Sequence, residues 1–450
     1  MRFRKVSDNL ILFSIGIIVF SFFLGTPKEI MQGMYAICTS HDTLISDNIE
    51  IAGVAASFFN SGCVLLVSMI LIKFSKEVVN GMTLAQAGLM VGFAFFGKNP
   101  FNILPIVLGS FIYSVYRREH FSKYAGVSLM ATSLSPLVSY LGLYKPGVMY
   151  IILGILVGIA VGFIIPSLSA YTFKIQNGMN IYNMGFACGL LAMIVTPFLK
   201  GFGVEFVPVL RWSTGNNIFL GSLMIALCLG CVVIGSFFCK RKGKEAWKRY
   251  GNLLKSTGRA PSDFLRIYGN APVFINTGIN GLIGVAYILL IGGDLNGPTI
   301  GGIVTIMGFS AYGKHARNML PIMLGVLIGQ FVMRGDLTNP SMQLAGLFCT
   351  TLAPISGHFG WKYGVIVGFL HSAIILYTGV VSGGMNLYNN GFSAGLLAIV
   401  FYPLITATIE HRKLVMQEQD YFDVFEHAGR IDAKTVDAII EPIDDADVIE

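Results

Sequence analysis

The chain has 450 residues, of which 54% are hydrophobic and only 12% are charged. Soluble globular domains carry about 25% charged residues, so this composition excludes a soluble enzyme, a disordered chain, a collagen and a coiled coil. Glycine is frequent, with 53 residues, and it is more common in membrane helices than in soluble ones. The composition predicts an all-α integral membrane protein that has the lipid bilayer as a partner.

Charged residues are spread unevenly along the chain. The formal net charge is +7, yet 11 of the 24 acidic residues lie in the last 40 positions. The basic residues fall in loops and form no stripe interleaved with aromatic residues, so no nucleic-acid partner is expected. The seven cysteines have no metal-ligand partners at a useful spacing. We therefore expect neither a metal nor a cofactor.

Ten apolar stretches, taken in chain order, each supply roughly the 17–25 residues that a membrane-spanning helix needs. The first follows Arg2, Arg4 and Lys5 and looks like a signal peptide, but no small-residue cleavage site comes after it. We interpret it as a retained first helix. The predicted spans are Leu10–Leu24, Ile51–Phe74, Tyr124–Leu141, Val148–Phe173, Asn183–Phe206, Ile218–Phe238, Val273–Leu290, Met342–Phe359, Tyr363–Val381 and Leu387–Thr408.

Two further apolar regions differ, because each consists of two short runs separated by polar residues. In the first region, the polar residues Gly-Lys-Asn-Pro separate Leu84–Phe96 from Phe101–Tyr116. In the second, Gly-Lys-His-Ala-Arg separates Ile300–Tyr312 from Asn318–Val332. Non-helical backbone at membrane depth is tolerated only where protein or a wet cavity covers it. We predict about ten transmembrane helices plus two re-entrant hairpins; two ordinary short spans in each place are the alternative.

Lysine and arginine in the loops orient the chain. The basic start, the loop Lys240–Arg259 and the pair Arg412 and Lys413 predict cytoplasmic N- and C-termini. Beyond residue 410 the pattern indicates short amphipathic segments at 421–428 and 433–440 and then an acidic, solvated end. The predicted organisation is a first helix with an outer loop (1–50), a membrane repeat (51–214), a linking helix with a basic cytoplasmic loop (215–270), a second repeat (271–410) and an acidic tail (411–450).

The sequence contains an internal repeat. Residues 58–109 align without a gap to residues 274–325, with 18 of 52 positions identical. A second, nine-residue motif also occurs twice. It reads Gly-Met-Asn-Ile-Tyr-Asn-Met-Gly-Phe from Gly178 and Gly-Met-Asn-Leu-Tyr-Asn-Asn-Gly-Phe from Gly384. Because the identities concentrate on Asn, Gly, Pro and Lys, they indicate a duplication and not shared hydrophobicity alone.

The number of crossings predicts how the two copies are related. Between the helix near Asn60 and its copy near Asn276 the chain is expected to cross the bilayer five times, and a hairpin adds an even number. An odd count inverts the second copy, so the halves should be two inverted-topology repeats. Inverted repeats recur among transporters, where the substrate site lies near the midplane at discontinuous helices.

Lys98 and its copy Lys314 are the first candidate site residues, because an ionisable residue at membrane depth is costly and is a functional candidate by default. Two ammonium groups at hairpin tips would favour an anion or an electronegative solute; the alternative is that each lysine extends to the membrane interface. Paired asparagines could line the solute path or cap broken helices. These candidate substrate-binding asparagines are Asn60, Asn276, Asn102, Asn318, Asn180, Asn183, Asn386 and Asn389.

Several catalytic patterns are absent from the sequence. It contains no phosphate-binding Walker loop, no zinc-protease helix and no Ser-x-x-Lys nucleophile motif, so we expect no enzymatic activity. No Asp or Glu lies inside a confidently predicted span, which argues against a proton pump that relies on buried carboxylates. It favours a channel, a facilitator, or ion coupling through backbone carbonyls and asparagine.

The repeated Gly-Met-Asn-x-Tyr-Asn-x-Gly-Phe and Gly-Lys-x-x-x-Asn-x-Leu-Pro motifs resemble those of an uncharacterised bacterial multi-pass family, domain of unknown function 1576. This resemblance covers nearly the whole chain and implies a bacterial cell membrane, but it implies no activity. A local resemblance to urea transporters rests on Tyr182-Asn183-Met184-Gly185, on its copy from Tyr388, and on two Leu-Pro pairs. The order of the motifs differs from the urea pattern, which also lacks the paired lysine.

These patterns together predict a membrane transporter of a small polar or anionic solute, whose re-entrant hairpins meet near the midplane. Two alternatives remain open from the sequence. One is a passive channel for a small neutral solute such as urea, and the other is a non-transporting membrane scaffold or sensor that acts through the acidic tail. The expected partners are the bilayer and a small-molecule solute, with a homo-oligomer left open.

Overall fold

A computed structural model describes residues 2–239, 242–333 and 336–411. The predicted amphipathic segments and acidic end of the tail lie outside these residues. Apart from one isolated bridge between Asp263 and Tyr312, the described residues contain helices and no β-structure. The expected all-α fold is therefore confirmed.

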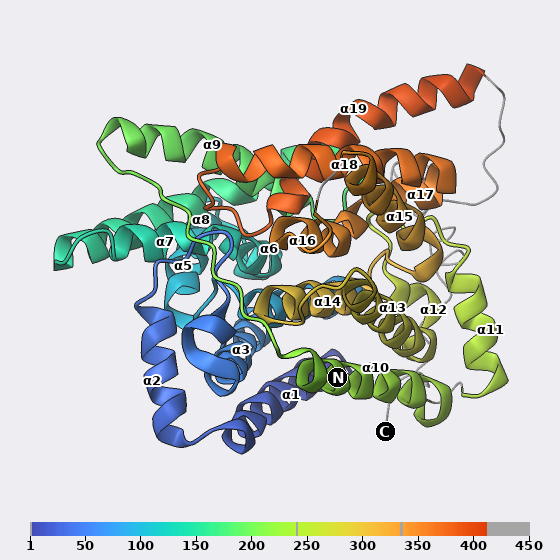
Figure 1. Ribbon diagram of the computed structural model, residues 1–450, viewed down its shortest axis with the longest axis horizontal. Coiled ribbons are helices and arrows are strands. Elements are labelled where there is room, and N and C mark those ends of the chain that lie inside the picture. Colours follow the sequence, from blue (N-terminus) through green and yellow to red (C-terminus); the bar gives the residue numbers. More distant parts are fainter. Residues whose placement is uncertain (1, 240–241, 334–335, 412–450) are drawn as a thin grey trace.

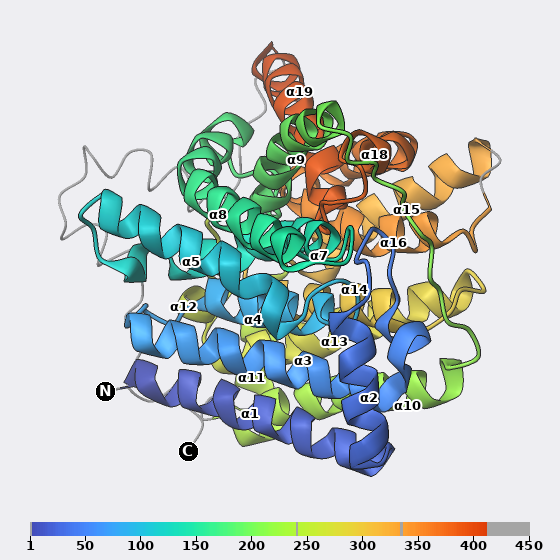
Figure 2. The same ribbon diagram turned by 90° about the vertical axis from the view of Figure 1, so that its left-hand side faces the viewer.

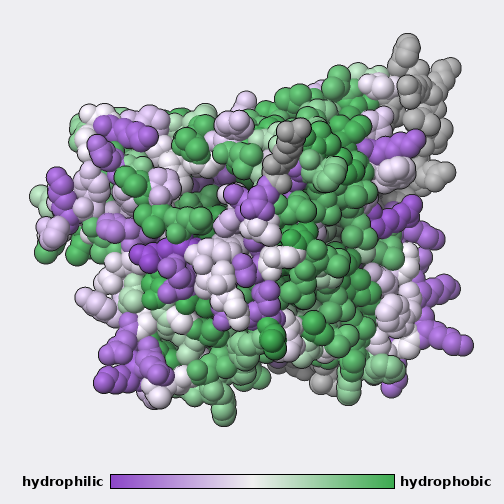
Figure 3. Space-filling view, in the orientation of Figure 1, coloured by the Kyte–Doolittle hydropathy of each residue, from purple (hydrophilic) through white to green (hydrophobic). Residues whose placement is uncertain are grey.

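Eight of the described helices are long and apolar enough to cross a bilayer. Their outer surfaces are apolar, since large hydrophobic side chains such as Phe23, Leu156 and Ile218 are exposed. Hydrophobic residues cover a broad area over α13 and α15, and hydrophilic residues lie to the left of that area and along the right-hand edge of the face (Figure 3). The eight helices are α1 (Arg2–Leu24), α3 (Asn48–Ser75), α8 (Val148–Gln176), α9 (Asn183–Gly201), α10 (Asn217–Val233) with its π-helical extension η3 (Ile234–Phe238), α13 (Asn270–Leu290), α18 (Trp361–Val381) and α19 (Asn389–His411).

Four shorter apolar helices form the two regions predicted as hairpins. They are α4 (Gly81–Phe93), α5 (Pro100–Tyr116), α14 (Gly297–Phe309) and α15 (Ala316–Val332). Asn80 and Asn296 are the N-cap residues directly before α4 and α14. Each side chain accepts a hydrogen bond from the backbone N–H of the threonine three residues on, at 3.2 Å in both. This capping role, one of the two predicted for asparagine, satisfies N–H groups that have no partner within the helix.

Two expected spans are not continuous helices. Residues 124–141 form α6 (Ala125–Ala131), the 3₁₀ turn η2 (Thr132–Leu134) and α7 (Ser135–Gly142). Residues 342–359 form α16 (Pro340–Phe348), the 3₁₀ turn η4 (Cys349–Leu352) and α17 (Ala353–Phe359). A proline is the second residue of both α7 and α17. Because proline has no backbone N–H, it removes a hydrogen bond from the interior of a helix and is best accommodated in a first turn. The 3₁₀ turns therefore interrupt what hydropathy predicts as single spans.

The remaining short elements lie in connections. Helix α2 follows α1 directly and begins with a capping box, in which Thr26 and Glu29 bond each other's backbone N–H. The basic loop predicted at Lys240–Arg259 contains α11. The bounds of these elements are Pro27–Cys38 for α2, Phe121–Lys123 for the 3₁₀ turn η1, Lys244–Leu253 for α11 and Phe264–Tyr268 for α12.

Helices from the two parts of the chain pack in corresponding pairs. Helix α1 packs on α3 as α10 packs on α13, and α5 packs on α8 as α15 packs on α18. At the centre α4 lies against α14, and at one end α9 lies against α19 (Figures 1 and 2). A Cβ atom added to Gly88 would stand 2.8 Å from the Cα of Gly308. Glycine at this crossing therefore lets the two backbones approach, as small residues do between membrane helices.

Candidate functional site

The two Gly-Lys segments form breaks between short helices. Helix α4 ends at Phe93, and the chain turns through Gly97, whose φ of +100° favours glycine, before α5 begins. Gly313 adopts a φ of +89° at the corresponding place between α14 and α15. The backbone N–H groups of Lys98 and Lys314 donate to the carbonyl oxygens of Phe93 and Phe309, at 3.0 and 3.2 Å. Both lysines therefore lie at the end of an interrupted helix.

Asparagine side chains hold these breaks. The Asn60 amide donates to the carbonyl oxygens of Ala94 and Lys98, at 2.7 and 2.8 Å. Asn276 makes the corresponding pair of bonds in the second break, at 2.8 and 2.7 Å. Backbone carbonyls that leave a helix need such partners when water is absent. The geometry places both asparagines in a structural role at the breaks.

Asn102 and Asn318 complete the same breaks from the following helices. Each side chain accepts the N–H of the residue three positions earlier, at 2.9 and 3.0 Å. Each also donates to the carbonyl oxygen of the glycine before the lysine, at 3.0 and 2.9 Å. Four of the ten predicted site residues thus surround the segments that present two more of the ten, the lysines.

The Lys98 ammonium group lies among aromatic and sulfur atoms. Its Nζ donates to the hydroxyl of Tyr388 at 2.5 Å and lies 3.5 Å from the Sδ of Met90. It lies 4.7 Å from the ring centroid of Tyr388 and 5.5 Å from that of Phe93. Aromatic faces attract cations through their quadrupole, so these rings partly replace the hydration of the ammonium group.

Lys314 has corresponding surroundings. Its Nζ donates to the hydroxyl of Tyr182, and to Thr350 Oγ1 at 2.7 Å. The ring centroids of Tyr182 and Phe309 lie at 4.2 and 5.4 Å. Thr350 belongs to η4, so the 3₁₀ interruption directs a hydroxyl toward the ammonium group.

Each lysine is therefore held by a tyrosine from the other part of the chain. Lys98 meets Tyr388 and Lys314 meets Tyr182, and both lysine side chains are fully buried. The Phe348 ring bridges the two places, with its centroid 5.4 Å from Phe93 and 6.2 Å from Tyr182. Among the described residues no carboxylate contacts either ammonium group. We call these two lysines, two tyrosines and their aromatic neighbours the lysine–tyrosine cluster.

Asn180 and Asn386 position the two tyrosines. The Asn180 amide donates to the carbonyl oxygen of Gly391, and the Asn386 amide donates to that of Gly185, both at 3.0 Å. Each asparagine also accepts the N–H of the tyrosine two residues on, at 3.1 Å. The loops before α9 and α19 therefore grip each other, which explains why each tyrosine reaches across to the opposite lysine.

Asn183 and Asn389 point to neighbouring helices instead. The Asn183 amide donates to the carbonyl oxygen of Ser169 in α8 at 3.1 Å, and Asn389 hydrogen-bonds the Thr378 hydroxyl in α18 at 3.0 Å. Of the ten predicted residues, these two hydrogen-bond neither a break nor the lysine–tyrosine cluster.

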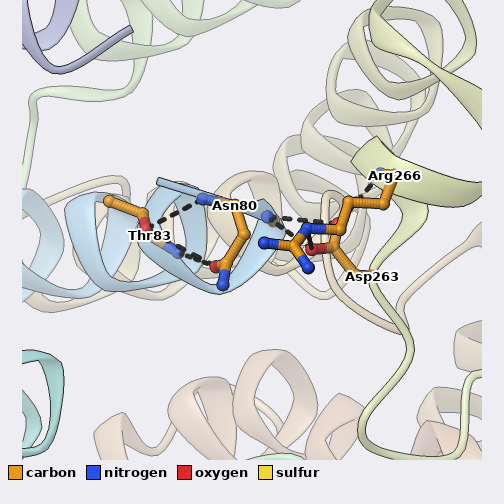
Figure 4. A network of polar contacts seen from close by, with 5 residues as sticks. Asn80, Thr83, Asp263 and Arg266 are labelled. Carbon is orange, nitrogen blue, oxygen red and sulfur yellow. Dashed lines mark hydrogen bonds and ion pairs between the residues drawn. The ribbon is translucent and has the colours of Figure 1, made fainter. Parts of the chain in front are cut away.

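Sequence reasoning missed Asp263, whose carboxylate binds the first backbone N–H of α4. Its carboxylate accepts the N–H of Gly81 at 3.1 and 3.2 Å and the N–H of Arg266 at 3.1 Å. The Arg266 guanidinium lies 3.4 Å away. Figure 4 shows this carboxylate beside the Asn80–Thr83 cap of α4. Burial raises the pKa of Asp263, and the hydrogen bonds from Arg266 and Gly81 oppose the rise.

The Asp47 carboxylate binds the first backbone N–H of α14 in the same way. It accepts the N–H of Gly297 at 3.2 Å, the N–H of Ile49 at 2.8 Å and the Ser213 hydroxyl at 2.6 Å. Burial raises its pKa, and these hydrogen bonds oppose the rise. Asp47 and Asp263 are 216 residues apart, the same offset as the aligned block. Extending that alignment toward the N-terminus would have paired them.

A cavity of about 770 Å³ lies beside the first break, between α5, α7 and α8. Its lining is largely apolar, with Asn102 and Ser139 among its polar residues. Asp42, in the connection between α2 and α3, lies behind them and accepts from Asn102 at 3.1 Å. Burial raises the pKa of Asp42 to about 7, against the effect of hydrogen bonds from Ser139 and Asn102.

Comparison with known proteins places the chain in a family. No curated protein and no solved structure matches it. A family model described as a protein of unknown function (DUF1576) matches residues 26–201 and 242–407, well over half of the chain. This match confirms the family that the repeated motifs resemble, whereas the resemblance to urea transporters stays a prediction. The chain belongs to the DUF1576 family of proteins of unknown function.

Proposed function

We propose that this protein is a membrane transporter of a small solute that carries a negative charge or a strongly electronegative group. The observation that carries the proposal is the lysine–tyrosine cluster: two fully buried ammonium groups without a carboxylate partner among the described residues. Ionisable residues inside membrane proteins are costly and generally mark substrate or ion pathways. A small anion between the two lysines would supply the missing charge.

Corresponding contacts support two inverted repeats with re-entrant hairpins as the architecture of this transporter. The asparagine bonds to both breaks, the crossed lysine–tyrosine pairs and the crossed asparagine bonds all occur twice, once in each part of the chain. Helices α4 and α14 run in opposite directions, since Gly88 meets Gly308 while the later Gly92 meets the earlier Gly301. This arrangement is typical of carriers with a site at the repeat interface.

Burial of the cluster favours a carrier over an open pore. Lys98 and Lys314 have no exposed surface, and Tyr182 and Tyr388 are 4% exposed. A solute can reach these groups only if the surrounding helices move, as alternating access requires. Saturable uptake is therefore the expected behaviour.

The test is uptake of radiolabelled chloride, sulfate, phosphate and acetate, with urea as the neutral probe, into proteoliposomes. We expect saturable uptake of at least one anion and a loss of at least tenfold in Lys98→Met and in Lys314→Met. Methionine keeps the length of the side chain and removes the charge, and exchange of a buried charge for an apolar group is often tolerated by the fold. Lys362→Met is the matched control, because Lys362 is exposed on α18.

The outcomes separate the alternatives. Uptake that is unchanged in both folded methionine variants would remove the lysines from the mechanism. Urea permeation that does not saturate and ignores the lysines would favour the passive channel. Absence of flux for every probe would contradict a transporter of small anions.

A further inference from the structure

Two carboxylates, Asp47 and Asp263, each connect one part of the chain to the other. Asp47 precedes α3 and accepts the N–H of Gly297, the first residue of α14. Asp263 precedes α12 and accepts the N–H of Gly81, the first residue of α4. Both side chains are buried, at 0% and 7% exposure. Because a charge-assisted bond of this kind is strong when water is excluded, each carboxylate fixes a helix that belongs to the opposite repeat.

The residue after each carboxylate binds the break nearest to it. The N–H of Asn48 donates to the carbonyl oxygen of Phe95 at 3.0 Å, within the break that presents Lys98. The N–H of Phe264 donates to that of Ala311 at 3.1 Å, within the break that presents Lys314. Each carboxylate thus lies where one lysine-bearing break meets the first turn of the opposing short helix.

The two positions lie at opposite ends of the α4–α14 pair, because these helices are antiparallel. Asp47 joins the end of α4 to the beginning of α14, and Asp263 joins the end of α14 to the beginning of α4. Space at both contacts is tight: a Cβ atom on Gly297 would lie 2.4 Å from Asp47 Oδ1, and one on Gly81 would lie 2.6 Å from Asp263 Oδ1. Glycine is needed there so that the carboxylate can reach the backbone.

We propose that Asp47 and Asp263 are the two gates of the carrier, and that each controls access to the lysine in the neighbouring break. The proposal rests on the proposed transport function and names the positioning residues of its alternating access. Release of Asp47 from Gly297 opens the path to Lys98, and release of Asp263 from Gly81 opens the path to Lys314. Because the gates are at opposite ends of one helix pair, each can open while the other stays closed.

Two native cysteines can report which gate is open. Cys188 lies close enough to Lys98 for electrostatic interaction, and Cys349 has the same relation to Lys314. Both thiols are fully buried. The experiment uses the full chain in membranes, with either Cys188 or Cys349 as its single cysteine, and measures the rate of reaction with a membrane-impermeant maleimide added to each side in turn.

We expect Asp47→Ala to raise the labelling rate of Cys188 at least tenfold from one side only, with Cys349 unchanged. Asp263→Ala should raise that of Cys349 from the other side, with Cys188 unchanged. Gly297→Ala and Gly81→Ala disturb the same two contacts, because the added Cβ atom would push the carboxylate away from the helix. If an aspartate variant fails to fold, the corresponding glycine variant should give the same labelling pattern.

Equal labelling of both cysteines in every variant, or no change in variants that remain folded, would overturn the gates. Labelling needs no solute, so its result is separate from the uptake test. Selective labelling without uptake would retain the gates and reject anion transport. Uptake that survives while labelling is unselective would retain transport and reject the gates.

Discussion

At the scale of single residues, two opposing terms decide the state of the lysines. Removal of an ammonium group from water costs several kcal/mol. A contact with an aromatic face returns about 2 kcal/mol when it is desolvated, and a hydrogen bond to a charged group returns about 1.5–3 kcal/mol. Lys98 and Lys314 each have two aromatic faces and a tyrosine hydroxyl. These contacts offset part of the cost, and an anion between the two lysines, as proposed above, would offset more of it.

Asp42 leads to a prediction about pH. Its pKa is raised from 3.8 to about 7 in the folded chain. Below about pH 4 the carboxyl is protonated in both the folded and the unfolded chain and does not affect stability; above pH 7 the folded chain bears the full cost of a buried carboxylate. Each pKa unit corresponds to about 1.4 kcal/mol, which gives a loss of stability on the order of 4 kcal/mol as the pH rises through this window. Asp42→Asn should therefore flatten the fall in melting temperature between pH 5 and pH 8.

Thermal unfolding in detergent at the two pH values measures this difference. Asp336→Asn is the control, because the Asp336 carboxylate is exposed and hydrogen bonds from Thr338 lower its pKa. It should leave the pH dependence as in the original chain. An equal slope in Asp42→Asn and the original chain would show that another group causes the effect.

The residues that sequence reasoning found and missed differ in a physical way. Lys98 and Lys314 could be predicted because a cation that recurs in an apolar region is conspicuous whatever it contacts. Tyr182 and Tyr388 lie in an equally repeated motif, but tyrosine fits an apolar pattern and reveals no partner. Asp47 and Asp263 lie outside the confidently predicted spans, and their contacts depend on which helix from the other part of the chain begins beside them. That information exists only in the tertiary arrangement.

At the scale of elements, the long helices follow from hydropathy, and the interruptions do not. Eight of the ten expected spans lie in long helices, of which α3 is kinked at Gly53, whereas residues 124–141 and 342–359 are divided by 3₁₀ turns. Hydropathy measures the apolar content of a stretch and not the path of its backbone. In the second interruption, the Thr350 hydroxyl that η4 supplies lies 2.7 Å from the Lys314 ammonium group. The element that sequence analysis read as an ordinary span is therefore part of the site.

The contact between α4 and α14 predicts a strong dependence on glycine. Gly88→Ala would place a Cβ atom 2.8 Å from the Gly308 Cα and 2.8 Å from the Val304 carbonyl oxygen. Backbone cannot yield as a side chain does, so we expect a loss of stability of about 1–3 kcal/mol, the usual cost of overpacking. Thermal unfolding in detergent should show a lower melting temperature.

Gly16→Ala is the matched control for this variant. A Cβ atom at Gly16, in the middle of α1, would meet nothing within 4 Å, and alanine favours a helix more than glycine does by up to about 1 kcal/mol. Its melting temperature should be unchanged or slightly higher. If Gly88→Ala behaved like Gly16→Ala, the close packing of the central pair would be wrong.

At the scale of the whole molecule, the proposed inverted relation between the two repeats predicts which loops share a side of the membrane. Lys76 follows α3, and Gly292 stands at the corresponding place after α13; both have positive φ, at 61° and 73°. Lys248 lies on α11, in the basic loop before α13. If the repeats are inverted, α3 and α13 cross in opposite directions, so the ends of these two corresponding helices emerge on opposite sides.

Labelling of single cysteines with a membrane-impermeant maleimide tests this arrangement. The cysteines replace the exposed residues Lys76, Lys248 and Gly292, one at a time, in a chain without other cysteines. Each variant is labelled in intact cells and in inverted vesicles. Lys76→Cys and Lys248→Cys should react from the same side, since a basic loop is expected to be cytoplasmic, and Gly292→Cys should react only from the other side. Reaction of Lys76→Cys and Gly292→Cys from one side would mean parallel repeats. The crossed lysine–tyrosine pairs could then not arise from a two-fold axis in the membrane plane, and a carrier that alternates between two equivalent gates would lose its structural basis.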